Sequence, residues 1–293
     1  MSYSCPNHCT KKSSENKFTI KKDGVYFRKS DSRMIQRFLC QICGKRFSNA
    51  TFSPCYRQKK RRVNEILFKL LSSGVSMRRA ALILNIHRTT VKRKLEFLAK
   101  RSKERHEKLL KTLEKGPVTH LQFDDLITIE HTKLKPLSVS IAVDAHRRII
   151  LGAEVSKIPA FGLLAEKSRQ KYGRRPNHHA KGLSRLFNSL LRAVDKNALI
   201  KSDEHQRYPE FVKKFFPSAV YKRYKGARGA VVGQGELKKI KRDPLFMLNH
   251  TCAMFRANVN RPIRKTWCTT KDPGMLQKHL FIYMDFHNSI LVR

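Results

Sequence analysis

The sequence predicts an α/β protein in which a mixed β-sheet with helices on both faces follows two smaller N-terminal modules. Two close pairs of cysteines lie in residues 1–57, and three successive helical patterns fill residues 58–116. Residues 117–293 alternate strand-like and helix-like patterns. A chain of 293 residues is long enough for two or three domains, so we expect these three segments to be separate domains.

Positive charge is the strongest compositional feature of the chain. Lys and Arg number 63 against 22 Asp and Glu, which gives a net charge of +41. Such a charge repels itself unless a polyanion neutralises it, so nucleic acid is the expected partner and an anionic membrane surface is the alternative. No segment approaches the roughly 18 consecutive apolar residues of a membrane span, and the first residues lack the apolar core of a signal peptide. We expect a cytoplasmic, nucleoid-associated protein without a membrane partner.

Four cysteines, Cys5, Cys9, Cys40 and Cys43, have the paired spacing of a structural zinc site. Two short turns can each present two thiolates to one tetrahedral ion, which predicts a zinc ribbon over residues 1–57. His8 competes with Cys9 as the fourth ligand, and four unrelated buried cysteines are the alternative. The other three cysteines are expected to be small apolar residues: Cys55, Cys252 and Cys268.

Residues 58–116 have the pattern of a helix-turn-helix followed by a linker helix. Apolar residues at helical spacing predict a helix over 63–71, and Ser76 is a good N-cap for a second helix over 77–84. A tight turn precedes a third, basic helix, whose N-terminal side chains are the expected DNA contacts. These are Arg88, Thr89, Thr90, Lys92 and Arg93. The alternative is a three-helix bundle with a solvated basic face.

The rest of the chain gives the order βββ-α-β-α-β-α, which matches an RNase H-like domain. Strands are predicted over 120–129, 137–143, 149–155, 198–203 and 219–221, and helices over 183–194, 208–216, 245–261 and 275–283. A basic loop containing Lys167, Arg169, Lys171, Arg174 and Arg175 is expected between the third strand and the first of these helices. That loop is either solvated or in contact with DNA.

Two aspartates occupy the strand positions at which this fold holds metal ions. Asp124 lies in the first strand and Asp203 ends the fourth, and Asp125, Asp144 and Glu154 are the rival acids. Asp124 is preferred because Leu121 and Phe123 alternate with it, which places it on the face opposite theirs. Carboxylate oxygens suit Mg²⁺, and two such ions activate a nucleophile and stabilise a leaving oxygen in phosphodiester chemistry. The alternative is that each aspartate is an ordinary turn residue.

The third metal ligand is less well defined. The predicted helix 245–261 contains no acid; Asn249 stands where a ligand is expected, and Arg256 lies two turns further along the same face. Glu236, after a glycine-rich stretch, is the other candidate.

Together these residues resemble the zinc-ribbon branch of the insertion-sequence DDE transposases, over nearly the whole chain. The similarity lies in the helix-turn-helix and in the motifs Gln36-Arg37-Phe38-x-Cys40-x-x-Cys43-Gly44-Lys45-x-Phe47, Phe123-Asp124-Asp125, Ser202-Asp203, and Asn249 through Arg264-Lys265-Thr266. The order of these motifs along the chain is more specific than any one of them.

The resemblance implies cleavage at the ends of a mobile element, dependent on Mg²⁺ or Mn²⁺, followed by transfer of the freed 3′-hydroxyl to target DNA. It implies that Asp124, Asp203 and Asn249 hold the metals and that Arg256 steadies phosphate. The zinc module and residues 88–93 would bind the terminal repeats in double-stranded DNA, and a homo-oligomer would pair the two ends. A non-catalytic DNA-binding repressor or an inactive transposase derivative is the competing reading, because position 249 is not an acid.

Overall fold

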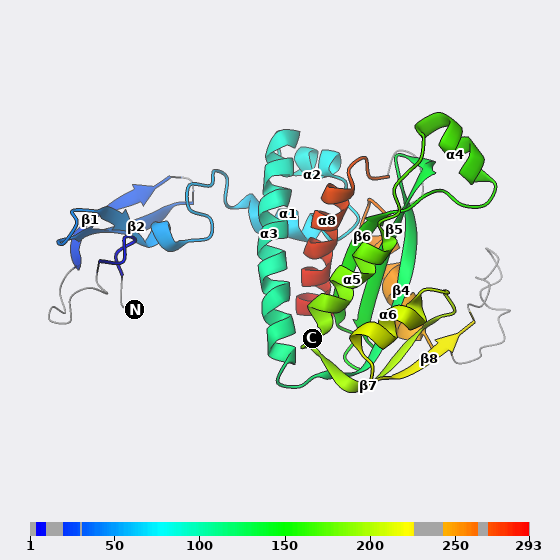
Figure 1. Ribbon diagram of the computed structural model, residues 1–293. Coiled ribbons are helices and arrows are strands. Elements are labelled where there is room, and N and C mark those ends of the chain that lie inside the picture. The colour runs from blue at the N-terminus through cyan, green and yellow to red at the C-terminus, as the bar shows by residue number, and fades with distance from the viewer. Residues whose placement is uncertain (1–3, 10–19, 30, 226–242, 263–268, 293) are drawn as a thin grey trace. The chain divides into compact units, whose positions relative to one another are not determined.

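The computed structural model describes residues 4–9, 20–29, 31–225, 243–262 and 269–292 (Figure 1). Contacts within the chain divide it into two compact units, Met1–Ile66 and Leu67–Arg293. Among the described residues, none of the helices combines the length and the apolar character that a membrane crossing needs.

The first unit is built on a small antiparallel sheet in the order β1-β2-β3 (Figure 1). Its strands are β1 (Ile20–Arg28), β2 (Arg33–Cys40) and β3 (Arg46–Ser48), and a 3-10 turn, η2 (Asn49–Phe52), follows. The buried cluster of this unit consists of Cys5, Phe38, Cys40 and Phe47. Among the residues that the structure describes, this cluster contains two aromatic side chains and is small for an independently folded module, so we expect a further stabilising element.

Three helices follow, with bounds close to those that the apolar spacing predicts. They are α1 (Val63–Leu71), α2 (Met77–Ile83) and α3 (Arg88–Leu113), and α3 is one continuous helix. Ser76 caps α2 by accepting a hydrogen bond from the Arg79 backbone N–H at 3.3 Å. Gly74, with φ of +73°, makes the turn between α1 and α2 in a backbone conformation that side chains with a Cβ rarely adopt.

The second unit is organised around a five-stranded mixed sheet in the order β6-β5-β4-β7-β8 (Figure 1). The strands are β4 (Val118–Glu130), β5 (Thr132–Asp144), β6 (Ile150–Lys157), β7 (Val194–Asp203) and β8 (Val220–Tyr224). The first three form an antiparallel meander, while β7 pairs parallel to β4 and β8 parallel to β7. The predicted α/β class with a mixed sheet is therefore confirmed.

Helices cover both faces of this sheet. One core cluster joins α5 (His179–Leu190) and α6 (Tyr208–Phe215) to the face that carries Leu121 and Phe123. The other joins α7 (Phe246–Asn258) and α8 (Pro273–Phe286) to the opposite face, through residues such as Leu126. A π-helical turn, η4 (His287–Leu291), ends the described chain. Successive residues of β4 thus face different helices.

Two expectations for this region were wrong. Lys167, Arg169 and Lys171 lie on a helix, α4 (Leu164–Tyr172), and not in a loop. Only Ser168 of α4 is buried, so the helix lacks the apolar stripe by which the sequence would reveal it. Val194 begins β7 instead of ending the preceding helix.

Four features named from the sequence lie outside the described residues: Glu236, the glycine-rich stretch around it, Arg264-Lys265-Thr266 and Cys268.

Candidate functional site

Asp124 and Asp203 lie on neighbouring parallel strands at matching positions. Gln122 pairs with Lys201 in the β4–β7 register, so two residues further along each strand Asp124 comes opposite Asp203. Residues at matching positions of adjacent strands project from the same face of a sheet. Two carboxylates separated by 79 positions in the sequence (203 − 124) therefore meet at one place.

The two carboxylates interact electrostatically. Burial and then the charge of Asp203 raise the pKa of Asp124 from its ordinary 3.8 to about 7. Within the described part of the chain, hydrogen bonds reach only one oxygen of Asp124: Oδ1 accepts from the Asp125 backbone N–H at 2.7 Å and from the Tyr208 hydroxyl at 3.3 Å. A bound divalent cation would relieve the repulsion between this half-buried carboxylate and its neighbour.

Helix α7 lies over the same face of β4. The Gln122 side chain, two residues before Asp124, donates to the Pro244 carbonyl at 3.1 Å and accepts from the Leu248 backbone N–H at 3.1 Å. Burial, followed by the charge of Asp124, raises the pKa of the Cys252 thiol to about 12, while the Arg256 charge acts in the opposite direction. Asp124 therefore interacts with the face of α7 that carries Cys252 and, one turn further, Arg256.

The side-chain amide nitrogen of Asn249 already donates a hydrogen bond. Asn249 is exposed on α7, three residues before Cys252, and its Nδ2 donates to Asp243 Oδ2 at 2.7 Å. Its carbonyl oxygen is the atom that remains to act as a ligand. Asp243 is an exposed carboxylate that the sequence reasoning missed, and its other oxygen accepts from the Leu245 backbone N–H at 2.9 Å. An acid followed by proline just before a helix is a signal that would have identified it.

The rival acid Asp125 points to the other face of β4 and is fully engaged. Its carboxylate accepts hydrogen bonds from Ser138 and Ser140 at 2.6 Å each, from Tyr208 at 2.7 Å, and from the His179 ring. Burial alone would raise the pKa of Asp125, but the hydrogen bond and charge of His179 and the two serines outweigh it, so the pKa is lowered. This buried network holds Asp125 in place and leaves Asp124 as the carboxylate that is better able to bind a cation.

The other two rival acids have structural partners. Asp144 is buried at the end of β5, where it accepts from the backbone of the following turn and pairs with Arg147 at 2.5 Å. Glu154 pairs with Arg185 at 3.1 Å. Asp144 is therefore a turn residue at the end of its strand, and Glu154, inside β6, is held by an ion pair.

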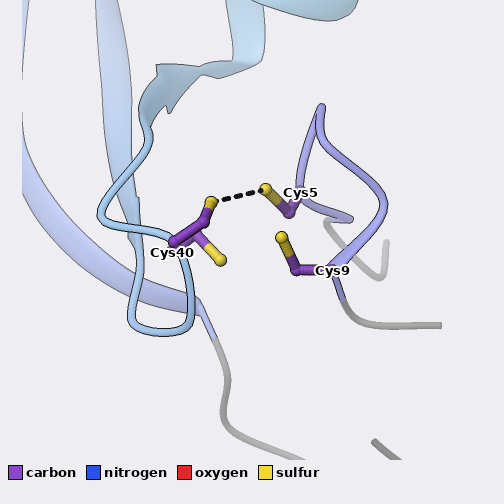
Figure 2. Close-up of side chains that lie close together, drawn as sticks. Cys5, Cys9 and Cys40 are labelled. Carbon is purple, nitrogen blue, oxygen red and sulfur yellow. Dashed lines mark hydrogen bonds between the residues drawn. The ribbon is translucent and has the colours of Figure 1, made fainter. Parts of the chain in front are cut away.

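The four N-terminal cysteines converge on one point. The Sγ atoms of Cys5, Cys9, Cys40 and Cys43 all lie within 4.8 Å of one another, and Cys5 Sγ is 3.6 Å from Cys43 Sγ. Figure 2 shows the sulfur atoms directed toward a common centre. A tetrahedral zinc ion with Zn–S bonds of about 2.3 Å separates its sulfurs by roughly 3.8 Å. The cluster can therefore hold a metal ion such as zinc.

The protonation of these thiols also suits metal binding. All four are free cysteines, so no disulfide competes for them. A hydrogen bond from the Lys45 backbone lowers the pKa of Cys43 to about 7, while the pKa of Cys9 rises to about 12, first because of its hydrogen bond with Cys43. A bound cation would stabilise the thiolate forms of the quartet, including that of Cys9, whose pKa is raised without one.

The predicted DNA contacts lie on the surface at the start of α3. Arg88, Thr89, Lys92 and Arg93 are exposed and Thr90 is half-buried, whereas Val91 and Leu95 are buried on the opposite side of the helix. The apolar side of α3 thus faces the protein and its basic side faces outward. The side chain of His87 caps the helix by accepting from the Thr89 backbone N–H.

No known protein family matches this chain, and no curated protein matches it.

Proposed function

We propose that the protein is a DNA transposase of the DDE type, with an RNase H-like catalytic domain, which cleaves DNA and transfers strands in a metal-dependent reaction. The observation that carries the proposal is the placement of Asp124 and Asp203 on adjacent parallel strands, each two residues beyond the paired Gln122 and Lys201, where the charge of Asp203 helps to raise the pKa of Asp124 to about 7. The strand order, with an antiparallel meander joined to two parallel strands, is the order expected of that fold.

In this proposal Asp124 and Asp203 hold Mg²⁺ or Mn²⁺, with the Asn249 carbonyl or the neighbouring Asp243 as the third oxygen donor. The bound metal would supply Lewis-acid stabilisation of the attacking and leaving oxygens. Tyr208 and the Asp125 network position Asp124 from the other side of the strand. Arg256 is exposed on the α7 face near Asp124 and is suited to contact a phosphate group.

The DNA-binding parts of the proposal are the helix-turn-helix of α1 to α3 and the zinc ribbon. Arg88, Thr89 and Lys92 would contact DNA at the outward side of α3, and the zinc ion would be held by the cysteine quartet. The net charge of +41 supports a polyanionic partner. Strand transfer at paired ends also calls for a homo-oligomer.

The test is cleavage and strand transfer on a labelled duplex that carries the sequences flanking the gene, with Mg²⁺ or Mn²⁺. We expect wild-type protein and Asp195→Ala to be active, because Asp195 lies at the other end of β7. We expect Asp203→Ala to bind the duplex but to cut it at least about 100-fold more slowly. Unchanged cutting by Asp203→Ala would overturn the assignment.

A DNA-binding repressor without catalytic activity is the second candidate. It is favoured by one observation, that Asn249 contributes no negative charge and donates its amide to Asp243. This candidate predicts binding of the same duplex with no cleavage in either metal. Cleavage by the wild-type protein in either metal would decide against the repressor, whereas nicking gained only in Asn249→Glu would show that position 249 occupies a weakened ligand site.

A further inference from the structure

A large groove in the second unit separates the turn around α2 from the segments that flank α8. It has a volume of about 1280 Å³ and is lined by residues from 73–92 on one side, by residues from 260–261 and 269–279 on the other, and by His131. Pockets for small molecules have volumes of about 300–1,000 Å³. A groove of this size suits a segment of an extended polymer better than a metabolite.

The lining of the groove is strongly basic. Six of its side chains carry a positive charge, and Asp272 is the only carboxylate among the groove residues. The six are Arg78, Arg79, Arg88, Lys92, Arg261 and Lys271. His279 also lines it, but burial lowers the pKa of this ring to about 4, so it is neutral at physiological pH. Positive side chains therefore come from both walls.

Arg261 is a poorly solvated cation inside this groove. Its guanidinium donates to Thr270 Oγ1 at 3.3 Å and contacts Met77 Sδ at 3.7 Å, and neither partner carries a charge. It forms no ion pair within salt-bridge distance in the part of the chain that the structure describes; burial lowers its pKa, and the charge of Asp272 acts in the opposite direction. A desolvated charge without a direct ion-pair partner is costly, so an anion entering the groove would be stabilised there.

The two walls are fixed to each other before any ligand arrives. The Gly74 backbone N–H donates to the Asn258 carbonyl at 2.7 Å, and the His279 ring is hydrogen-bonded to the Leu71 carbonyl at 2.7 Å. A Cβ on Gly74 would come within 3.2 Å of the Ala257 carbonyl oxygen, so glycine permits this close approach. The groove is thus pre-formed, which reduces the entropic cost of binding.

We propose that this groove binds the sugar-phosphate backbone of one strand of the DNA duplex that α3 contacts. The inference rests on the DNA binding in the proposed function and extends it to residues outside the helix-turn-helix, chiefly Arg261 and Lys271. Arg88, Thr89 and Lys92 belong both to the groove and to the start of α3, so one strand can contact both. The N-terminus of α3 adds a favourable dipole for phosphate.

The test compares variants from the two walls with a charge-matched control. Arg78→Gln and Lys271→Gln each remove one exposed cation from opposite walls, and Lys108→Gln removes one from exposed α3 surface outside the groove lining. Binding to a fluorescein-labelled, mixed-sequence DNA duplex of about 30 base pairs is measured by anisotropy over a series of salt concentrations. All three side chains are exposed, so the variants are expected to fold as wild type does.

We expect each wall variant to weaken binding about 3–10-fold at low salt and to reduce the slope of log affinity against log salt by about 1. We expect Lys108→Gln to leave that slope unchanged. The groove proposal is overturned if the wall variants keep the wild-type slope, or if Lys108→Gln reduces it equally. Failure of the proposed function looks different: wild-type protein would not bind the duplex at all, or would bind it and never cut in Mg²⁺ or Mn²⁺.

Discussion

Replacing Asp203 with asparagine should make the metal-free protein more stable while removing its response to metal. Asparagine has nearly the same shape as aspartate, and its carbonyl can still accept the hydrogen bond that the His205 backbone N–H donates to Asp203 Oδ1 at 3.1 Å. The main change is the loss of a negative charge beside Asp124. The repulsion between the Asp124 and Asp203 carboxylates, which favours metal binding in the wild-type protein, would then disappear.

The size of the effect follows from the pKa of Asp124. A rise from 3.8 to about 7 corresponds to about 4 kcal/mol for holding this carboxylate ionised, at about 1.4 kcal/mol per pH unit. Burial is the larger cause and the charge of Asp203 the next, so we assign about 1–2 kcal/mol to the repulsion. For a domain the size of Leu67–Arg293 this gives a rise in Tm of about 2–8 °C.

The sign of the pH dependence is also determined. Because the folded-state pKa of Asp124 is raised, its ionisation destabilises the fold above about pH 7, and that loss is relieved as the pH falls toward 4. The advantage of Asp203→Asn over wild type should therefore be full at pH 8 and should shrink at pH 5, where Asp124 is protonated in both proteins.

Thermal unfolding is followed by far-UV circular dichroism in buffer passed over a chelating resin, with and without added Mg²⁺. We expect Mg²⁺ to raise the Tm of wild type and of Asp195→Asn, a matched control on the same strand, but not that of Asp203→Asn. The reasoning is refuted if Asp203→Asn is less stable than wild type at pH 8 without metal, or if it keeps the full Mg²⁺ response.

Three further predictions concern other parts of the chain. Chelating zinc, or the substitution Cys40→Ser, should sharply increase hydrogen exchange in β1 to β3 and leave exchange in α8 unchanged, as measured by mass spectrometry of peptic fragments. Cys55→Ser, outside the quartet, should leave exchange in β1 to β3 unchanged, and an equal increase in this variant would contradict the prediction. His279, bonded to the Leu71 carbonyl and with a pKa lowered by burial to about 4, should contribute stability that is complete above pH 6.5 and falls by about 3 kcal/mol toward pH 4. His279→Gln should flatten that fall in a pH series of urea unfolding curves, and an equally steep fall would contradict this origin. Tyr208→Phe removes a 2.7 Å hydrogen bond to a buried carboxylate and should cost about 1.5 kcal/mol, seen as a Tm lower by about 3–6 °C; an unchanged Tm would show that the hydroxyl is dispensable.

Patterns with strong periodicity allowed most of the second unit to be predicted. The helical stripe from Leu183 to Leu190 corresponds to α5, because burial on one face selects that spacing. The alternation in residues 137–143 corresponds to β5, which is buried on both faces, with large apolar residues on one face and the small Ser138, Ser140 and Ala142 on the other. The sequence pattern did not predict helix α4, because Ser168 is its only buried residue and the helix therefore needs no apolar stripe. Its basic residues are therefore compatible with either loop or helix until the backbone is known.

The groove was beyond sequence reasoning for a different reason. Arg78 and Lys271 are almost two hundred positions apart and belong to segments that no local pattern connects. Their common location depends on contacts between the α1–α2 segment and the segments around α7 and α8, among them the Gly74 hydrogen bond to Asn258 and the buried His279 ring of α8 on the Leu71 carbonyl. Such long-range contacts leave only weak signals in the sequence, here a glycine and a histidine.

The pair Asp124-Asp125 shows how strand geometry separates two identical side chains. Alternation along β4 sends Asp125 toward α5 and α6, where His179, Tyr208 and two serines satisfy it and lower its pKa. The same alternation sends Asp124 toward α7 and opposite Asp203, where its pKa rises to about 7. A carboxylate with four donors has little capacity left for a cation, whereas one that repels its neighbour gains from binding one. The assignment of Asp124 over Asp125 therefore follows from the different partners on the two faces of one strand.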